Sequence, residues 1–414
     1  MNWATKSLAQ LCSPRRELEE PSADGTNRYV GLEHLDPGWI SIRRWGSDRE
    51  VCSTKSRFHR GDVLYGKLRP YLDKAALAEW GGVCSTDILT LAPDLEEADP
   101  WFLALLLHTR TFLDHAIATT SGVNHPRTSW QEISRFSSAV PPVPEQRGIA
   151  GVLAKIQRAV EVEDKRITAL KELKAATMAK VFREGLRGEP VKESEIGAIP
   201  RSWSVTHLGN LIVRGPQNGL YKPASEYGIG SPIVRIDTFD QEGELSTLDF
   251  RRVRLTPDEV RTYGLSPGEI LINRVNSLSH LGKSLLVPAL PETTVYESNM
   301  MRFGVDEDRL RPDYLALYLL SPAAKSHFLA TAKPAVAQAS FNQGDLGSLR
   351  IPLPPTTAEQ REISGLAGVI SARYRAAARS VRGHEELFHA ALAQLMTGQL
   401  RVTPLLDRKG APDA

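Results

Sequence analysis

The chain has 414 residues, a net charge of +2 and apolar side chains at 41% of its positions, which is ordinary for a folded protein of two to four domains. No apolar run reaches the roughly 18 residues that a membrane helix needs, and the first residues, MNWATKSLAQLC, lack a signal-peptide core, so we expect a cytoplasmic protein without membrane contact. The spacing of Cys12, Cys52 and Cys84, and of the ten histidines, predicts neither a disulfide framework nor a metal site.

Residues 1–144 are predicted to form a domain that mixes short strands with one helix. Runs such as VLYGKL and DILTLA alternate and are bounded by Gly or Pro, as strands are. Apolar periodicity predicts a single amphipathic helix over 101–118. Nine basic against four acidic residues lie between 43 and 74, and seven acidic against one basic between 79 and 114. This segregation fits a domain with one basic face, although a mixed, solvated surface would explain it equally well.

A proline-rich stop, PPVPEQ at 141–146, precedes a long predicted helix. Proline disfavours helix before it and is tolerated in the first turn after it, so Pro144 should begin the helix. Seam residues then recur from 149 to 181 at alternating spacings of four and three, which is the heptad pattern of a coiled coil or long helix pair. Gly185 and Gly188 should end it. The polar seam residues Glu163 and Lys174 can specify register or face a partner.

The second half of the chain repeats the first. Five segment pairs match in the same order, at offsets drifting from about 200 to 214 residues. They are NWATKSLAQL with SWSVTHLGNL, GDVLYGKLR with GEILINRVN, DPWFLALLL with RPDYLALYL, PPVPEQ with PPTTAEQ, and ELKAATMAKVF with ELFHAALAQLM. The matches predict a second domain with one helix over 314–331, then a second long helix that follows the Pro354–Pro355 pair and ends at Gly398.

These elements predict a mixed α/β (α+β) fold with an internal, pseudo-two-fold duplication. Two globular domains alternate with two long helices that form an antiparallel coiled coil; the intervening domain is long enough for either orientation, but the antiparallel one closes the duplicated molecule. The predicted parts are a first domain (1–144), a central helix and linker (145–199), a second domain (200–357), a C-terminal helix (358–400) and a tail (401–414).

Reaction centres are not evident in the sequence. HLGKS at 280–284 resembles the end of a phosphate-binding loop, but Ser277 stands where that motif needs glycine. There is no GxSxG and no Asn-Pro-Pro-Tyr or Asp-Pro-Pro-Tyr run. The acidic group Glu161, Glu163 and Asp164 is most simply a solvated helix face. We therefore expect no catalysis by this chain.

The paired arrangement of two unlike domains and two long helices, each helix opening with a Pro-Pro…Glu-Gln signature, resembles the specificity subunit of a Type I restriction–modification system. A Trp…Leu…Leu run begins each half, and Trp203 follows IPRSW. The resemblance covers essentially the whole chain. It implies that each domain is a target-recognition domain that reads one half of a split, asymmetric double-stranded DNA target.

The resemblance also implies partners. The two helices would space the domains and dock two modification subunits, which hold S-adenosylmethionine and methylate adenine. Restriction subunits that use ATP are optional further partners. The chain itself would bind no cofactor. We expect the helix starts to contribute to docking, through Glu145, Gln146, Glu359 and Gln360.

Candidate DNA contacts are the Arg, Lys, Asn, Gln and His residues of the loops that match across the duplication, because these side chains read base edges or phosphates. Each has a simpler alternative as a surface charge or cap. In the first domain they are Arg43, Arg44, Lys67, Arg69, Lys74, His125 and Arg127. In the second domain they are Arg274, Asn276, Lys283, Gln338 and Asn342.

Three other classes remain open: a two-domain DNA-binding regulator, an orphan reader without enzyme partners, and a coiled-coil adaptor that binds only protein. The first two predict a DNA footprint, the third predicts none, and copurification of a methyltransferase separates all three from the main interpretation. Residues 1–144 carry 18 acidic against 16 basic residues. We therefore expect the chain alone to bind DNA weakly and with strong salt dependence.

Overall fold

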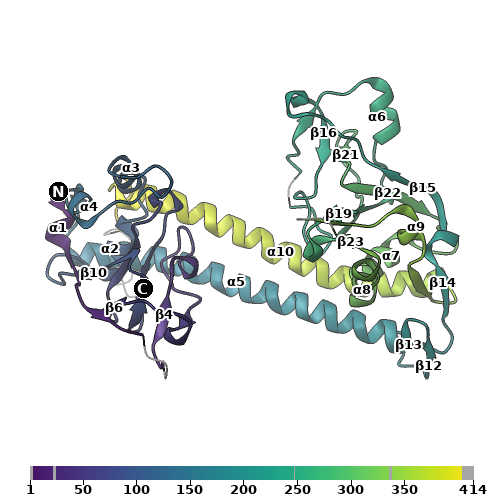
Figure 1. The fold of residues 1–414 in the computed structure, drawn as a ribbon, viewed down its shortest axis with the longest axis horizontal. Helices are drawn as coiled ribbons and strands as arrows, with labels where there is room; N and C mark the ends of the chain where they lie inside the picture. The colour runs from purple at the N-terminus through teal and green to yellow at the C-terminus, as the bar shows by residue number, and fades with distance from the viewer. Residues whose placement is uncertain (1–2, 22–24, 247, 335–337, 403–414) are drawn as a thin grey trace, which may run out of the picture. The chain divides into compact units, whose positions relative to one another are not determined.

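The longest elements of the chain are two helices, α5 (Val143–Glu184) and α10 (Thr357–Met396) (Figure 1). The computed structural model describes residues 3–21, 25–246, 248–334 and 338–402. The chain divides into two compact units: unit 1 is Met1–Asp164 with Ala378–Ala414, and unit 2 is Lys165–Ala377. Each unit therefore contains a globular part and portions of both long helices.

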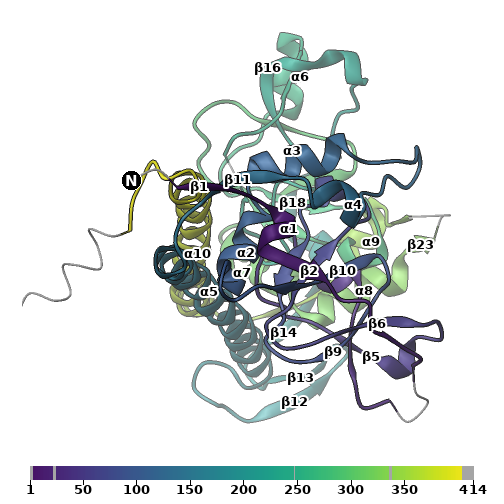
Figure 2. The same cartoon turned by 90° about the vertical axis from the view of Figure 1, so that its left-hand side faces the viewer.

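The globular part of unit 1 is built on two sheets, with strand orders β2-β10-β7-β8 and β3-β6-β9-β4-β5. A third pairing, of β1 with β11, joins the beginning of the chain to the strand that precedes α5 (Figure 2). The strands are β1 (Ala4–Ser7), β2 (Cys12–Pro14), β3 (Leu18–Glu19), β4 (Arg28–Val30), β5 (Gly46–Ser47), β6 (Lys55–Phe58), β7 (Val63–Gly66), β8 (Ala75–Leu77), β9 (Gly82–Cys84), β10 (Ile88–Pro93) and β11 (Ser137–Val140). The helices are α1 (Leu8–Leu11), α2 (Pro100–Leu106), α3 (Arg110–Ala118) and α4 (Trp130–Ile133).

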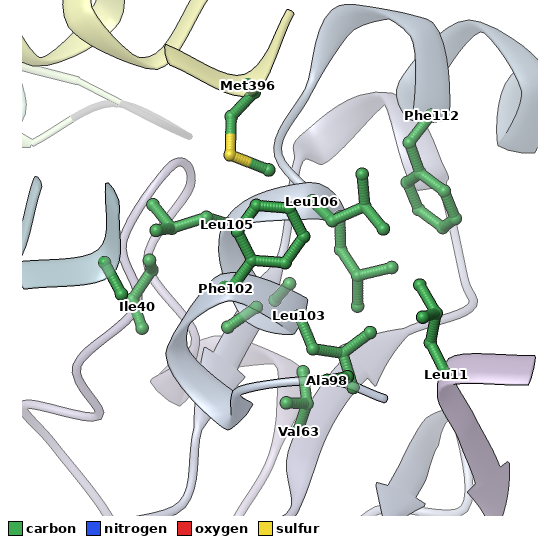
Figure 3. Close-up of a cluster of buried hydrophobic side chains, with 14 of the residues drawn as sticks. Leu11, Ile40, Val63, Ala98, Phe102, Leu103, Leu105, Leu106, Phe112 and Met396 are labelled. Carbon is green, nitrogen blue, oxygen red and sulfur yellow. The ribbon is translucent and has the colours of Figure 1, made fainter. Parts of the chain in front are cut away.

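Helix α2 lies at the centre of the unit 1 core (Figure 3). Its residues from Phe102 to Leu106 are buried on every side, which explains the uninterrupted apolar run FLALL. Val63 of β7 and Met396 of α10 contribute to the same cluster. Burying side chains of this size stabilises the fold by about 1.5–3 kcal/mol each, so the end of α10 is an integral part of unit 1.

Unit 2 has the sheets β15-β22-β18-β20, β17-β16-β21 and β19-β24-β23, with the pairs β14-β25 and β12-β13. The strands are β12 (Val191–Ser194), β13 (Gly197–Pro200), β14 (Ser204–His207), β15 (Ile212–Asn218), β16 (Tyr227–Val234), β17 (Arg252–Val253), β18 (Ile270–Asn273), β19 (Val275–Asn276), β20 (Ser284–Leu286), β21 (Val295–Tyr296), β22 (Met300–Val305), β23 (Lys333–Pro334), β24 (Ala339–Ser340) and β25 (Arg350–Leu353). The helices are α6 (Pro257–Tyr263), α7 (Pro312–Leu319), α8 (Pro322–Thr331) and α9 (Gln343–Gly347).

The two globular parts share the strand order of their four-stranded sheets. The order β2-β10-β7-β8 of unit 1 corresponds to β15-β22-β18-β20 of unit 2, and each unit pairs the strand before its long helix with a strand from its start. In each unit one further pairing is parallel: β4 with β9, and β16 with β21. The duplication inferred from the sequence is therefore present in the strand order.

The long helices begin and end close to where the sequence predicts. Helix α5 begins one residue before Pro144 and stops at Glu184, followed by Gly185 with a left-handed φ of 69°. Helix α10 ends at Met396, and Gly398 has a φ of 71°. Glycine adopts this conformation without the Cβ clash that other residues incur, and so it terminates a helix. The predicted seam positions of α5, which alternate in spacings of four and three from 149 to 181, are all buried or half-buried, and so are the positions 214 residues later in α10.

Within each unit the two long helices run in opposite directions. In unit 1 the apolar core contains Ile149 and Leu153 from the start of α5 together with Leu395 from the end of α10. In unit 2 Met178 of α5 shares a core with residues near the start of α10. Farther along that unit, the Lys171 ammonium lies 5.5 Å from the centre of the Tyr374 ring.

The prediction of one helix in each domain before the proline-rich stop is wrong. Residues 101–118 fall into α2 and α3, and residues 314–331 into α7 and α8. The side chains of Thr109 and Ser321 cap the second helix of each pair, accepting hydrogen bonds from the N–H groups of Phe112 and Ala324. The apolar periodicity continues across these caps, so it could not reveal the break.

Candidate nucleic-acid interface

In unit 1 the structure brings together two loops that carry predicted DNA contacts. The turn after β7 lies beside the loop before α4, because the Thr128 N–H donates to the carbonyl of Lys67 (3.0 Å) and the Arg69 N–H donates to that of Pro126 (2.8 Å). Lys67 and Arg69 are half-buried, with no side-chain hydrogen bond among the described residues. The two loops form what we name the Lys67 cluster, consisting of Lys67, Arg69, His125 and Arg127.

Arg69 has a left-handed backbone, with φ of 52°. For a residue with a Cβ this conformation costs roughly 1–2 kcal/mol, and such strain is found preferentially at functional sites. The bond to Pro126 and a second bond, from the Leu72 N–H to the carbonyl of Arg69 (2.9 Å), hold the strained residue in place. The strain supports a function for this loop beyond connecting strands.

Arg127 of the same cluster is ion-paired. Its Nε lies 3.0 Å from Oδ1 of Asp87, and the contact raises the pKa of Arg127, chiefly through the side-chain hydrogen bond. The ion pair fixes an exposed guanidinium against the turn that carries Lys67, whose N–H donates to the carbonyl of Asp87 (3.0 Å).

Unit 2 repeats this arrangement with different side chains. Strand β19 pairs with β24, which places Asn276 opposite Ala339, next to the exposed Gln338. The Phe341 N–H donates to the carbonyl of Arg274 (3.1 Å), which ties the two segments together. The residues that meet here, which we name the Arg274 cluster, are Arg274, Asn276 and Gln338.

Lys283 lies apart from the Arg274 cluster, and its prediction as a DNA contact is corrected. The residue is 6% exposed. Its ammonium donates to the carbonyl oxygens of Phe239 (2.7 Å) and Ile236. Burial lowers the pKa of this amine, against the raising effect of Asp240 and Asp237. The side chain holds a neighbouring loop in place and presents no group to a ligand.

Four other predicted contacts are engaged inside their units. Arg43 and Arg44 pair with Asp36, and Arg43 also reaches Asp164 of α5 (3.2 Å), so Arg43 attaches this loop to the long helix. Lys74 Nζ donates to the carbonyl of Leu32 (2.5 Å). Asn342 is the N-cap of α9 and accepts a bond from the Asp345 N–H (3.0 Å). These residues lie outside the two clusters, and the geometry gives each of them a structural role.

The Gln of each Pro-Pro…Glu-Gln signature is fully buried. Gln146 accepts a hydrogen bond from the Asp99 N–H (2.8 Å) and donates to the carbonyls of Glu97 and Pro141 (2.9 Å each). Gln360 makes the matching bonds in unit 2, to the N–H of residue 311 (2.8 Å) and the carbonyl of residue 309 (3.0 Å). Both amides lock a long helix to the globular part of their own unit. The predicted docking role is corrected for these two residues, because a buried side chain with its polar atoms in use cannot form a docking surface.

The Glu of each signature binds the tryptophan that opens its half. The Trp3 indole N–H donates to Glu145 (3.1 Å), and that of Trp203 donates to Glu359 (3.1 Å). In unit 1 Arg401 adds two bonds to Glu145, of 2.6 Å and 2.9 Å. The repeated signature and the repeated tryptophan therefore occur together because they bind each other. The sequence pattern alone did not show this link.

The described part of the chain contains no helix with the length and apolar character of a membrane span. Within the same residues, no group of three or more His, Cys, Asp or Glu side chains has a metal-binding arrangement.

Comparison with solved structures defines the class of fold. The chain resembles the Type I restriction–modification S subunit from M. genitalium, with a TM-score of 0.56 at 14% identity, over 95% of this chain and 96% of that one. It also resembles a chain from a structural study of the assembly and conformational transition of the type I R-M system, with a TM-score of 0.53 at 20% identity, over 96% of this chain and 98% of that one. The chain has the mixed α/β fold of these specificity subunits.

Curated relatives carry the same description. The chain is 33% identical over 177 residues to the putative type I restriction enzyme MjaX specificity subunit of Methanocaldococcus jannaschii, covering 42% of this chain and 41% of the relative. Further curated relatives are Type I specificity subunits as well, at 20% to 26% identity. The first three relatives are matched over 41%, 43% and 56% of their own length. No family model matches the chain. The resemblance stated from the sequence is confirmed by these relatives and folds.

Proposed function

We propose that this chain is the DNA-recognition subunit of a Type I restriction–modification complex and performs no catalysis itself. The observation that carries the proposal is the duplicated architecture: two domains built on a four-stranded sheet of the same strand order present unlike polar side chains from matching loops. An enzyme needs one reaction centre, whereas a reader of a split target needs two equivalent frames with different contacts. The likeness to Type I specificity subunits in fold and sequence supports this assignment.

We assign one half of the target to each domain, residues 1–144 and 200–357. The Lys67 cluster is the reading surface of the first domain, and the Arg274 cluster that of the second. Arg and Lys pair with guanine acceptors, and Asn and Gln with adenine. The Lys67 cluster has no amide side chain, whereas the Arg274 cluster combines one arginine with two amides, and this difference favours unlike half-sites.

The long helices are the proposed docking surface for two modification subunits. Apolar side chains lie exposed along them, including Val162 (63%), Leu173 (52%), Val369 (59%) and Leu387 (51%). We assign these exposed apolar side chains to the contact with the modification subunits. S-adenosylmethionine would be held by the modification subunits and ATP by any restriction subunits, with the assembly acting in the cytoplasm and the paired helices acting as a coiled-coil spacer.

The proposal predicts that DNA binding by this chain depends on its partner subunits, and this dependence can be measured. We expect the chain alone to bind duplex DNA weakly, with an affinity that falls steeply between about 50 and 200 mM salt, because its net charge is near zero. The assembly with modification subunits should bind much more tightly. A gel-shift titration of both species on the same duplex measures the difference; equal affinities would instead support a free-standing DNA-binding regulator.

A further inference from the structure

Unit 2 contains a cavity of about 480 Å³, and none of the DNA contacts predicted from the sequence lines it. It lies among β16, the segment after β15 and the turn before β22. Its polar lining consists mainly of Tyr221, Lys222, Arg235, Arg251, Glu297 and Asn299. Three cations against one carboxylate, with Tyr221 and Tyr227 beside them, make this cavity suited to an anionic or acceptor-rich ligand.

Arg235 is held in the cavity by a carboxylate at one side of its guanidinium. Its Nε lies 3.3 Å from Oε2 of Glu297, and the two side chains are 28% and 11% exposed. The other oxygen of Glu297 accepts a bond from the Ile236 N–H (2.7 Å). Burial raises the pKa of the Glu297 carboxyl, and the Ile236 N–H and Arg235 act against that rise. Glu297 thereby fixes the direction in which Arg235 points.

This pairing leaves the outer edge of the guanidinium available. Within the described residues neither Nη atom of Arg235 has a hydrogen-bond partner, and its nearest ring is that of Tyr227, centred 5.8 Å away. A guanidinium whose Nε side faces a carboxylate, here as an ion pair without a hydrogen bond, presents its two Nη groups on the other side as a planar fork. Such a fork recognises two acceptor atoms side by side, as on a guanine edge or a phosphate.

The other cations differ in how far they are neutralised. Lys222 forms an ion pair with Glu259 (2.7 Å). Arg251 is exposed and has no ion pair among the described residues. Tyr221, which is 79% exposed, stands at the rim of the cavity. The net positive charge of the cavity therefore comes from Arg251, while Arg235 supplies the fixed geometry.

The cavity continues from the Arg274 cluster. The Arg274 N–H donates to the carbonyl of Asn299 (2.9 Å), and Nη1 of Arg274 approaches the carbonyl of Ser298 (3.4 Å). Both Ser298 and Asn299 line the cavity. A ligand that touches Arg274 can therefore extend to Arg235 along one surface of unit 2.

Unit 1 lacks the same pair at the matching positions. Val30 and Cys84 pair in parallel as Val234 and Tyr296 do, so the residues that follow them correspond. Position 31 is glycine where unit 2 has Arg235, and position 85 is serine where unit 2 has Glu297. The Arg–Glu pair therefore distinguishes the second domain from the first.

We propose that this cavity, named here the Arg235 pocket, is a DNA contact of the second domain, in which the fork of Arg235 takes a pair of acceptor atoms from the second half-site. The inference rests on the proposed function and deepens it. A guanine edge and a phosphate share the required chemistry. Arg251 adds attraction for the backbone, and Asn299 adds an amide beside the fork.

Two substitutions test the pocket while preserving the fold. Arg235→Lys keeps a cation beside Glu297 but removes the fork, and Arg251→Ala removes an exposed cation. Arg261→Ala is the matched control, because Arg261 is 75% exposed on α6 and pairs with Asp258 away from the pocket. Each variant would be assembled with its modification subunits, and the methylated adenines of the cell would be mapped. Binding would be titrated against salt, on a duplex carrying the unaltered motif.

Contact with a guanine edge predicts that Arg235→Lys relaxes one position of one half-site, with discrimination reduced about 10- to 100-fold. Contact with a phosphate predicts uniform weakening by Arg235→Lys with an unchanged salt slope, because the charge is kept, and a salt slope reduced by about one for Arg251→Ala, which removes a charge. The proposal is contradicted if Arg235→Lys and Arg251→Ala, like Arg261→Ala, both leave the methylated motif and the slope of log affinity against log salt as they are in the unaltered complex. Absence of any split motif with the unaltered chain would instead overturn the proposed function itself, and the inference with it.

Discussion

Replacing Gln146 with alanine is expected to lower the free energy of unfolding of unit 1 by about 3 to 5 kcal/mol. The fully buried amide satisfies three backbone groups: the N–H of Asp99 and the carbonyls of Glu97 and Pro141. Each buried group left without a partner costs roughly 1–3 kcal/mol. Urea unfolding of the full chain, followed by tryptophan fluorescence, measures the loss.

Gln394→Ala is the matched control for that experiment. Gln394 also lies in unit 1, on α10, but its side chain is exposed and has no hydrogen bond among the described residues. Its replacement should change the free energy of unfolding by no more than about 0.5 kcal/mol. Equal effects of the two substitutions would show that Gln146 does not lock α5 to the domain.

The double variant Lys67→Ala with Arg69→Ala is expected to weaken DNA binding by the assembled complex at least about 30-fold at physiological salt. Two cationic contacts are removed, and each base contact of this kind contributes about 1–3 kcal/mol of discrimination. To the extent that they touch phosphates, the slope of log affinity against log salt should fall by up to about two. Filter binding over a salt series measures both quantities.

The double variant Arg110→Ala with Arg135→Ala removes the same charge from the same unit. Both side chains are exposed and ion-paired, Arg110 to Asp114 on α3 and Arg135 to Glu132 of the adjacent α4. Their removal should leave affinity within about twofold, because such surface pairs contribute little. If both double variants weaken binding alike, general charge and not the Lys67 cluster accounts for the affinity.

The long helices could be predicted because their determinants are local. Proline before each start, glycine after each end and a seam between them define a helix within one stretch of sequence. The division of residues 101–118 into α2 and α3 was missed because the cap at Thr109 interrupts the backbone without interrupting the apolar pattern. A periodicity of side chains reports burial and carries little information about where hydrogen bonding stops.

The candidate site was predicted only in part, because sequence proximity does not report what a side chain meets. Lys283 looked like a loop cation, but it is buried against carbonyl oxygens of a distant loop. Arg235 was missed because its partner, Glu297, reaches it only through the parallel pairing of β16 with β21. The loops of the Lys67 cluster were found because each carries several cationic or amide residues and matches a loop of the other half.

The measurement that tests the account most directly is a genome-wide map of methylated adenines in the native host, with and without the gene for this chain. We expect deletion to remove methylation at one split motif, made of two short, unlike half-sites around a fixed gap, and to leave every other methylated motif in place. An unchanged map, in a host whose modification subunits are expressed, would contradict the assignment of this chain as the specificity subunit.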